Sequence, residues 1–147
     1  MRIDRILIWG AVALLVIVLG GGWAIDFATA GGVSLQARIS PSVLPADGFS
    51  SGRFVVRATN ADGSPRAGDT IEVLRQGTGA FDRTRALTDA GGVALFLYTT
   101  SRSNKYQPAQ PVPVIVTDTS LGRLIEIDKN VTISINVVDP SKLKKRS

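Results

Sequence analysis

The chain has 147 residues, with 17 lysines and arginines against 12 aspartates and glutamates and a formal net charge of +5 at pH 7. It has no cysteine, which excludes disulfides and thiolate metal sites, and no histidine, which removes the commonest general base and transition-metal ligand. The length favours one compact β-domain of about 100 residues behind an apolar N-terminal segment.

Residues 1–5 carry two arginines and precede an uncharged apolar run over residues 6–25. A helix of that length, at about 1.5 Å per residue, spans roughly the 30 Å hydrocarbon core of a bilayer. Basic residues beside a span stay in the cytoplasm, and the indole rings of Trp9 and Trp23 suit the two headgroup levels. The pattern predicts a transmembrane helix (a signal anchor) in the cell membrane, crossing the bilayer once, with residues 1–5 cytoplasmic and the rest extracytoplasmic.

A cleaved signal peptide is the alternative interpretation of this segment. Ala28-Thr29-Ala30 fits the A-x-A pattern that precedes a cleavage site. The apolar core of a signal peptide is usually about 7–15 residues long, which fits here only if that core ends at Leu19. In both interpretations the rest of the chain leaves the cytoplasm, with a linker over 26–32.

The excess positive charge lies outside the predicted domain over residues 33–140. That domain holds eleven basic and ten acidic residues, whereas a tail over 141–147 holds four basic ones. A nucleic-acid-binding domain carries basic charge on one face, together with aromatic rings for stacking. No nucleic-acid partner is therefore expected. The tail is interpreted as a solvated end, with contact to an anionic polymer or an acidic subunit as the alternative.

The domain is predicted to be all-β, because short strand patterns alternate with turn residues and no helical period persists. Apolar residues alternate with polar ones over 33–40 and again over 53–60, where Phe54, Val56 and Ala58 share a face. Further strands are predicted at residues 70–75, 81–87 (a short edge strand), 93–100, 112–119 and within 123–139, the last with a bulge or a hairpin near 129–130. About seven such strands predict a β-sandwich.

Two segments carry more specific expectations. Pro41 and Pro45 bracket a stretch that is expected to be an extended connection, since proline cannot donate to a central ladder. The strand over 93–100 is apolar on both faces, which is typical of a central strand that is covered on both sides.

Three turn motifs then resemble a known family. They are Ala46-Asp47-Gly48, the segment from Asn60 to Gly68 with its Gly-x-Pro, and the segment from Thr88 to Ala94. Together they resemble the bacterial immunoglobulin-like repeat of the invasin and intimin type (group 1), over about residues 35–138. The resemblance implies an immunoglobulin-like (Ig-like) β-sandwich outside a bacterial cell that acts as a spacer, stalk or binding module without catalysis. Asn60 departs from the commoner Asp of that family, and the chain has one copy rather than a tandem array.

The aspartates of these motifs are predicted to have a structural role. Asp47, Asp62 and Asp89 lie at or near glycines, where a carboxylate accepts hydrogen bonds from nearby backbone N–H groups and holds a tight turn. A calcium site built from clustered loop carboxylates is the alternative, but no ligand spacing supports it. No metal or cofactor is expected.

The leading functional hypothesis is a non-catalytic accessory subunit of an extracytoplasmic or cell-envelope assembly, which contacts protein partners through strand edges or loops. Five residues on two loop-like stretches are the candidate partner contacts: Arg83, Arg85, Arg102, Lys105 and Tyr106. The alternative is a secreted or surface-displayed, adhesin-like binding module for a glycan or host ligand. An enzyme is not expected, because without His or Cys no nucleophile has an evident base. The carboxylates of Glu126 and Asp128 lie two residues apart on one strand face, which more often indicates a solvated edge than a catalytic pair.

Overall fold

The computed structural model describes residues 12, 14–17, 32–120 and 129–143. Val12 and residues 14–17 are helical, but most of the predicted transmembrane helix over 6–25, including Trp9 and Trp23, lies outside the described residues. In the described part of the chain, no helix is both long and apolar enough to cross a membrane. Residues 1–5, most of the 26–32 linker and residues 144–147 of the basic tail also lie outside it.

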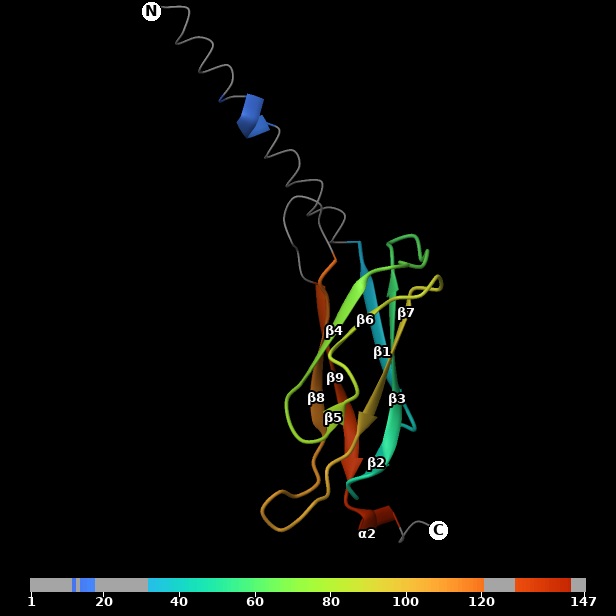
Figure 1. Cartoon of the computed structure of the whole chain (residues 1–147), viewed down its shortest axis with the longest axis vertical. Helices are drawn as coiled ribbons and strands as arrows, with labels where there is room; N and C mark the ends of the chain where they lie inside the picture. The colour runs from blue at the N-terminus through green and yellow to red at the C-terminus, as the bar shows by residue number, and fades with distance from the viewer. Residues whose placement is uncertain (1–11, 13, 18–31, 121–128, 144–147) are drawn as a thin grey trace, which may run out of the picture.

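The domain consists of two sheets packed face to face, in an elongated sandwich (Figure 1). One sheet, called here the β3 sheet, has the order β1 (Ser34–Ser40), β3 (Ser51–Thr59), β7 (Val93–Thr99), β5 (Ala80–Phe81). The other, the β8 sheet, has the order β2 (Val43–Pro45), β9 (Lys129–Val138), β8 (Val112–Asp118), β4 (Thr70–Arg75), β6 (Arg85–Leu87). A short helix, α2 (Pro140–Leu143), follows β9. The strand pairs are antiparallel except β2 and β9, which run parallel.

The core forms where the alternating apolar residues of the two sheets meet. Phe54, Val56 and Ala58 are fully buried on one face of β3, as predicted, and Ile71 and Val73 of β4 are buried in the facing sheet. Burial of a side chain of this kind contributes about 1.5–3 kcal/mol.

Aromatic rings fill one region of this core. The Phe54 ring lies edge-to-face against Phe81, with centroids 5.3 Å apart, and against Phe96 at 6.4 Å. Phe81 makes a further edge contact with Tyr98 at 5.3 Å. Such pairs contribute about 0.5–1.5 kcal/mol beyond their buried area, so β5 is held to the sandwich mainly by Phe81.

The proline-bracketed stretch contains a strand that the sequence did not predict. Val43 to Pro45 form β2, which pairs in parallel with residues 136–138 of β9, and the Leu44 side chain is buried. β2 is an edge strand, where a proline without an N–H is tolerated. The chain therefore crosses from the β3 sheet to the β8 sheet between Ser40 and Val43.

The single edge strand predicted over 81–87 is wrong, because this segment divides into β5 and β6, which belong to different sheets. The N–H of Asp82 still donates to the carbonyl of Leu97 in β7 at 2.9 Å. Two residues later, the carbonyl of Thr84 accepts from the N–H of Val73 in β4 at 2.8 Å. The chain thus changes its partner strand within the space of Arg83, and no continuous strand can form there.

The expectation that β7 is covered on both faces is also wrong. Ala94, Phe96 and Tyr98 point into the core and are buried, but Leu95 and Leu97 on the other face are 52% and 47% exposed. Each sheet of a sandwich packs against the other with one face only, so the outer face of the β3 sheet stays open among the described residues. In contrast, the strand predicted over 112–119 is confirmed as β8, and β9 runs without interruption from Lys129.

Candidate functional site

The turn after β2 is held by Asp47, as the sequence predicts. Its Oδ1 accepts hydrogen bonds from the N–H groups of Phe49 (3.1 Å) and Ser50 (2.8 Å), and its Oδ2 accepts one from the Ser50 hydroxyl at 2.6 Å. Desolvation by itself raises the pKa of this carboxyl, but the hydrogen bonds from Ser50, Phe49 and Thr100 outweigh it and lower the pKa to about 2. Asp47 therefore remains ionised and fixes the turn at the end of the sandwich.

The other two motif aspartates do the same in their own turns. Asp62 Oδ1 accepts from the N–H of Ser64 at 2.9 Å and from its hydroxyl at 2.6 Å, and these bonds lower the pKa of Asp62. Asp89 Oδ1 accepts from the N–H groups of Gly91 (2.8 Å) and Val93 (2.9 Å). The structural role predicted for all three aspartates is confirmed. Among the described residues, no three acidic side chains gather closely enough to hold a metal ion.

Three of the five predicted contact residues share the loop between β7 and β8, called here the β7–β8 loop (residues 100–111; Figure 1). Arg102 lies near its start and pairs with Asp47 in an isolated antiparallel bridge. Lys105 and Tyr106 follow, with Lys105 Nζ 4.8 Å from the centroid of the Tyr106 ring. An exposed contact of this kind contributes about 0.5–1 kcal/mol.

The Tyr106 side chain is 86% exposed although its backbone is held in a turn. Asn104 Oδ1 accepts hydrogen bonds from the N–H groups of Tyr106 (2.9 Å) and Gln107 (3.0 Å), and the backbones of Asn104 and Gln107 bond to each other. An Asx turn therefore presents an aromatic and a basic side chain to solvent.

The other two predicted contact residues come from a different segment. Arg83 lies between β5 and β6, and its Nε is 2.9 Å from Asp82 Oδ2. Arg85 lies on β6, with its Nη2 3.1 Å from Glu72 Oε2 of β4. Both side chains are more than half exposed, and solvent-exposed ion pairs of this kind contribute little to stability. The structure thus places the five residues in two groups rather than in one cluster.

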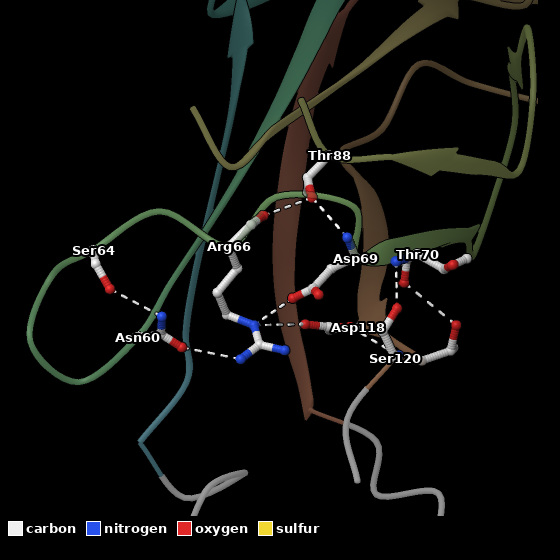
Figure 2. A network of polar contacts seen from close by, with 9 residues as sticks. Asn60, Ser64, Arg66, Asp69, Thr70, Thr88, Asp118 and Ser120 are labelled. Atoms are coloured by element: carbon white, nitrogen blue, oxygen red, sulfur yellow. Dashed lines mark hydrogen bonds and ion pairs between the residues drawn. The ribbon is translucent and has the colours of Figure 1, made fainter. Parts of the chain in front are cut away.

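A polar network that the sequence analysis missed lies near the opposite end of the sandwich, around Arg66 (Figure 2). The Arg66 guanidinium contacts Asp69 directly through Nε, donates to Asn60 Oδ1 from Nη1 at 3.0 Å, and has its Nε 3.8 Å from Asp118 Oδ2. The Thr88 hydroxyl donates to the Arg66 carbonyl at 2.6 Å and accepts from the Asp69 N–H at 2.9 Å. Segments distant in the sequence are joined by these bonds.

Asp118 is the buried member of this network. Its side chain is fully buried, Oδ1 accepts from the Ser120 N–H at 2.9 Å, and Oδ2 has no hydrogen-bond partner among the described residues. Burial raises the pKa of the Asp118 carboxyl, and the nearby Asp69 carboxylate raises it further. The hydrogen bond from the Ser120 N–H and the Arg66 guanidinium lower the pKa, but they only partly oppose this rise. In the sequence, only the single acidic residue Asp118 within the apolar alternation of 112–119 pointed to this network. Arg66 and Asp69 lie in the turn between β3 and β4, far from Asp118 in the chain.

Comparison with known proteins identifies the class of fold. The sequence matches no protein-family model, and it matches no curated protein. Among solved structures, the D00–D0 domains of intimin superpose with a TM-score of 0.51 at 16% identity, over 71% of this chain and 46% of that one. The D0–D1 domains of intimin superpose with a TM-score of 0.51 at 14% identity, over 73% of this chain and 50% of that one.

The chain therefore has the fold of a bacterial Ig-like domain of the intimin type. It spans about half of the length of the intimin fragments that it matches. At these identities the likeness defines the fold alone. The resemblance found in the three turn motifs is confirmed at that level.

Proposed function

We propose that this chain is a non-catalytic interaction module of a bacterial cell envelope, held in the membrane by residues 6–25 and contacting a protein partner through the β7–β8 loop. The uncharged run after two arginines supports the anchor, with residues 1–5 in the cytoplasm and the Ig-like domain outside. The intimin-type fold supports a role as an interaction module, by analogy only.

The position of the β7–β8 loop is the observation that carries this proposal. β1 begins at Ser34, which pairs with Thr59, whereas β7 ends at Thr99, which pairs with Ser51. The eight steps of β3 between those two levels span about 27 Å, at about 3.4 Å per residue. The loop therefore projects from the end of the sandwich opposite to the one where the chain enters from the N-terminal segment (Figure 1).

The side chains on this loop suit a protein contact. Tyrosine and arginine are enriched at interfaces, where an aromatic ring contributes large contact area and loses few rotatable bonds on binding. Tyr106 is held on a hydrogen-bonded turn, so little order has to be gained when a partner covers it.

Site-specific photocrosslinking tests the loop contact. A benzophenone amino acid at Tyr106 of the full chain, in membranes of cells that produce it at native level, should give an adduct with a defined membrane or envelope protein. The same probe at Thr132, which is exposed on β9, is the matched control and should give no adduct of that mass. An adduct with glycan alone favours the adhesin-like alternative, and equal adducts at both positions contradict the proposal.

Mass spectrometry of the same preparation tests the anchor. A peptide that contains Met1 and co-purifies with the membrane fraction supports retention of residues 6–25. A mature chain that begins at Gly31 contradicts it and supports a cleaved leader.

A further inference from the structure

The outer face of the β3 sheet combines three arginines with an apolar ridge. The strand register places residues of β1, β3 and β7 side by side on this face, in the rows Gln36–Arg57–Val93, Arg38–Val55–Leu95 and Ser40–Arg53–Leu97. We call the set Arg38, Arg53, Arg57, Val55, Leu95 and Leu97 the Arg–Leu face.

The charge of these three rows is of one sign. Asp82, which lies beside Leu97 at the β5 edge, pairs with Arg83 and accepts from the Leu97 N–H. The three rows contain no acidic residue, and none of the three arginines forms an ion pair with an acidic residue in the part of the chain that the structure describes. Arg53 and Arg57 are four residues apart on β3, which corresponds to about 13 Å along the strand, and Arg38 lies between their levels, about 4.8 Å away on β1. Three arginine positions therefore flank Val55.

The shape of the face matches this arrangement. Two open hollows of about 370 Å³ and 690 Å³ lie on it, and both are lined by Arg38 and Val55. Arg57 borders the first hollow and Arg53 the second. Each hollow thus offers an apolar floor between two arginines.

Leu95 and Leu97 extend the apolar surface onto β7. They are 52% and 47% exposed, and they flank each other at alternate positions of one strand. Exposed apolar side chains that lie together, rimmed by charge, mark an interaction surface more often than an isolated exposed leucine does.

We propose that the Arg–Leu face is a docking surface for a protein partner whose contact surface alternates carboxylates with apolar side chains. Carboxylates match the planar fork of arginine in bidentate pairs, and three arginines without an acidic partner among the described residues select carboxylates over basic groups. The ridge of Val55, Leu95 and Leu97 needs apolar cover at the same time. An anionic polymer or a phosphate group satisfies the arginines but leaves the leucines in water, so an acidic and apolar protein surface fits the face better.

This surface is separate from the β7–β8 loop, and the proposal does not depend on the role of that loop. A crosslink from one position without the other therefore distinguishes the two.

The test uses a benzophenone amino acid at Leu95 of the full chain, in membranes of cells that produce it. The expected result is an adduct whose partner peptide, sequenced by mass spectrometry, carries aspartate or glutamate among apolar residues. Arg38→Glu and Arg57→Glu, each made singly, should reduce the adduct yield roughly tenfold or more, because like charges across an interface cost several kcal/mol. Thr132→Glu introduces the same carboxylate on the outer face of the β8 sheet; it is the control and should leave the yield unchanged.

Each other outcome overturns the proposal. These outcomes are an adduct with lipid or glycan only, a partner peptide without acidic residues, no adduct at all, or a yield that the charge reversals leave unchanged. Thermal unfolding of the same variants tests whether a fall in yield comes from loss of folding. Both arginines are exposed, so their replacement should leave the melting temperature within about 2 °C of the wild type. If either variant unfolds early, Arg38→Gln and Arg57→Gln replace them, with a smaller but measurable fall in yield expected.

Discussion

Thr88 provides the sharpest test of how the Arg66 network stabilises the domain. Its hydroxyl is buried, donates to the carbonyl of Arg66 at 2.6 Å and accepts from the N–H of Asp69 at 2.9 Å. Thr88→Val keeps the shape of the side chain and removes both bonds. The carbonyl and the N–H then lose their partner in a part-buried site, and each such loss costs about 1–3 kcal/mol. Because both sites retain some access to water, we expect a total near the low end, about 2–3 kcal/mol.

Urea unfolding of the full chain in detergent micelles, followed by far-ultraviolet circular dichroism, measures this loss. The far-ultraviolet signal is needed because both tryptophans precede the domain and report little on its unfolding. A loss of 2–3 kcal/mol corresponds to a fall in melting temperature of about 8–24 °C, at about 4–8 °C per kcal/mol for a domain of this size. Thr99→Val is the matched control, because among the residues that the structure describes its hydroxyl bonds only to the Ser51 hydroxyl, at 2.9 Å in an exposed site. Equal losses for the two variants would refute the reasoning.

Four further predictions concern other positions. Asp118→Asn should remove part of the pH dependence of the free energy of unfolding. Because the pKa of Asp118 is raised in the folded state, its contribution to stability is fullest below pH 3.8 and falls as the pH rises through the raised pKa. The wild type should therefore lose stability relative to the variant toward neutral pH. Asp47→Asn should change the pH dependence in the opposite direction. The pKa of Asp47 is lowered to about 2, so its contribution to stability is present above pH 3.8 and lost as pH falls from 3.8 to 2. Acid titration of both variants, followed by circular dichroism, tests the two directions of pH dependence. Tyr98→Phe should cost about 1 kcal/mol in urea, since its hydroxyl donates to the Thr78 carbonyl at 2.8 Å. Gly79→Ala should cost about 3 kcal/mol or more, since Gly79 has φ +85° and an added Cβ would lie 2.7 Å from the Thr99 carbonyl oxygen and closer still to the Tyr98 hydroxyl; an unchanged denaturation midpoint would contradict that geometry.

The local sequence pattern was sufficient to predict burial where a strand has one buried and one solvent-exposed face. Phe54, Val56 and Ala58 alternate with polar or partly exposed residues, and the period of two placed them correctly in the core. The turn aspartates were equally predictable, because an Asx turn depends only on residues two to four positions away.

The same reasoning failed where the answer depends on a neighbouring element. Val43 to Pro45 form a strand only because β9 offers an edge to them, and nothing in the segment itself indicates that edge. The run from 93 to 100 places apolar residues on both faces of the strand, so its pattern gave no indication that Leu95 and Leu97 remain exposed.

The candidate sites show the same division. An exposed loop with Lys105 and Tyr106 is visible in the sequence, because its turn residues are local. The Arg–Leu face is not, because Arg38 meets Arg53 and Arg57 only once β1 pairs with β3 in a particular register. The pairing of Asp118 with Arg66 likewise joins the end of β8 to the turn between β3 and β4, and no sequence spacing predicts it.

The crossing of the chain from β1 to β2 has a mechanical consequence. The first strands of the domain pair with β3 in one sheet and with β9 in the other, so the N-terminal end is fastened to both layers. Hydrogen bonds in these pairs lie across the strands. Under the proposed function, tension between the N-terminal anchor and a partner at the β7–β8 loop would act along the strands and load the bonds between β1 and β3 in shear. Hydrogen bonds loaded in shear share the force, so the paired strands resist such tension as a unit.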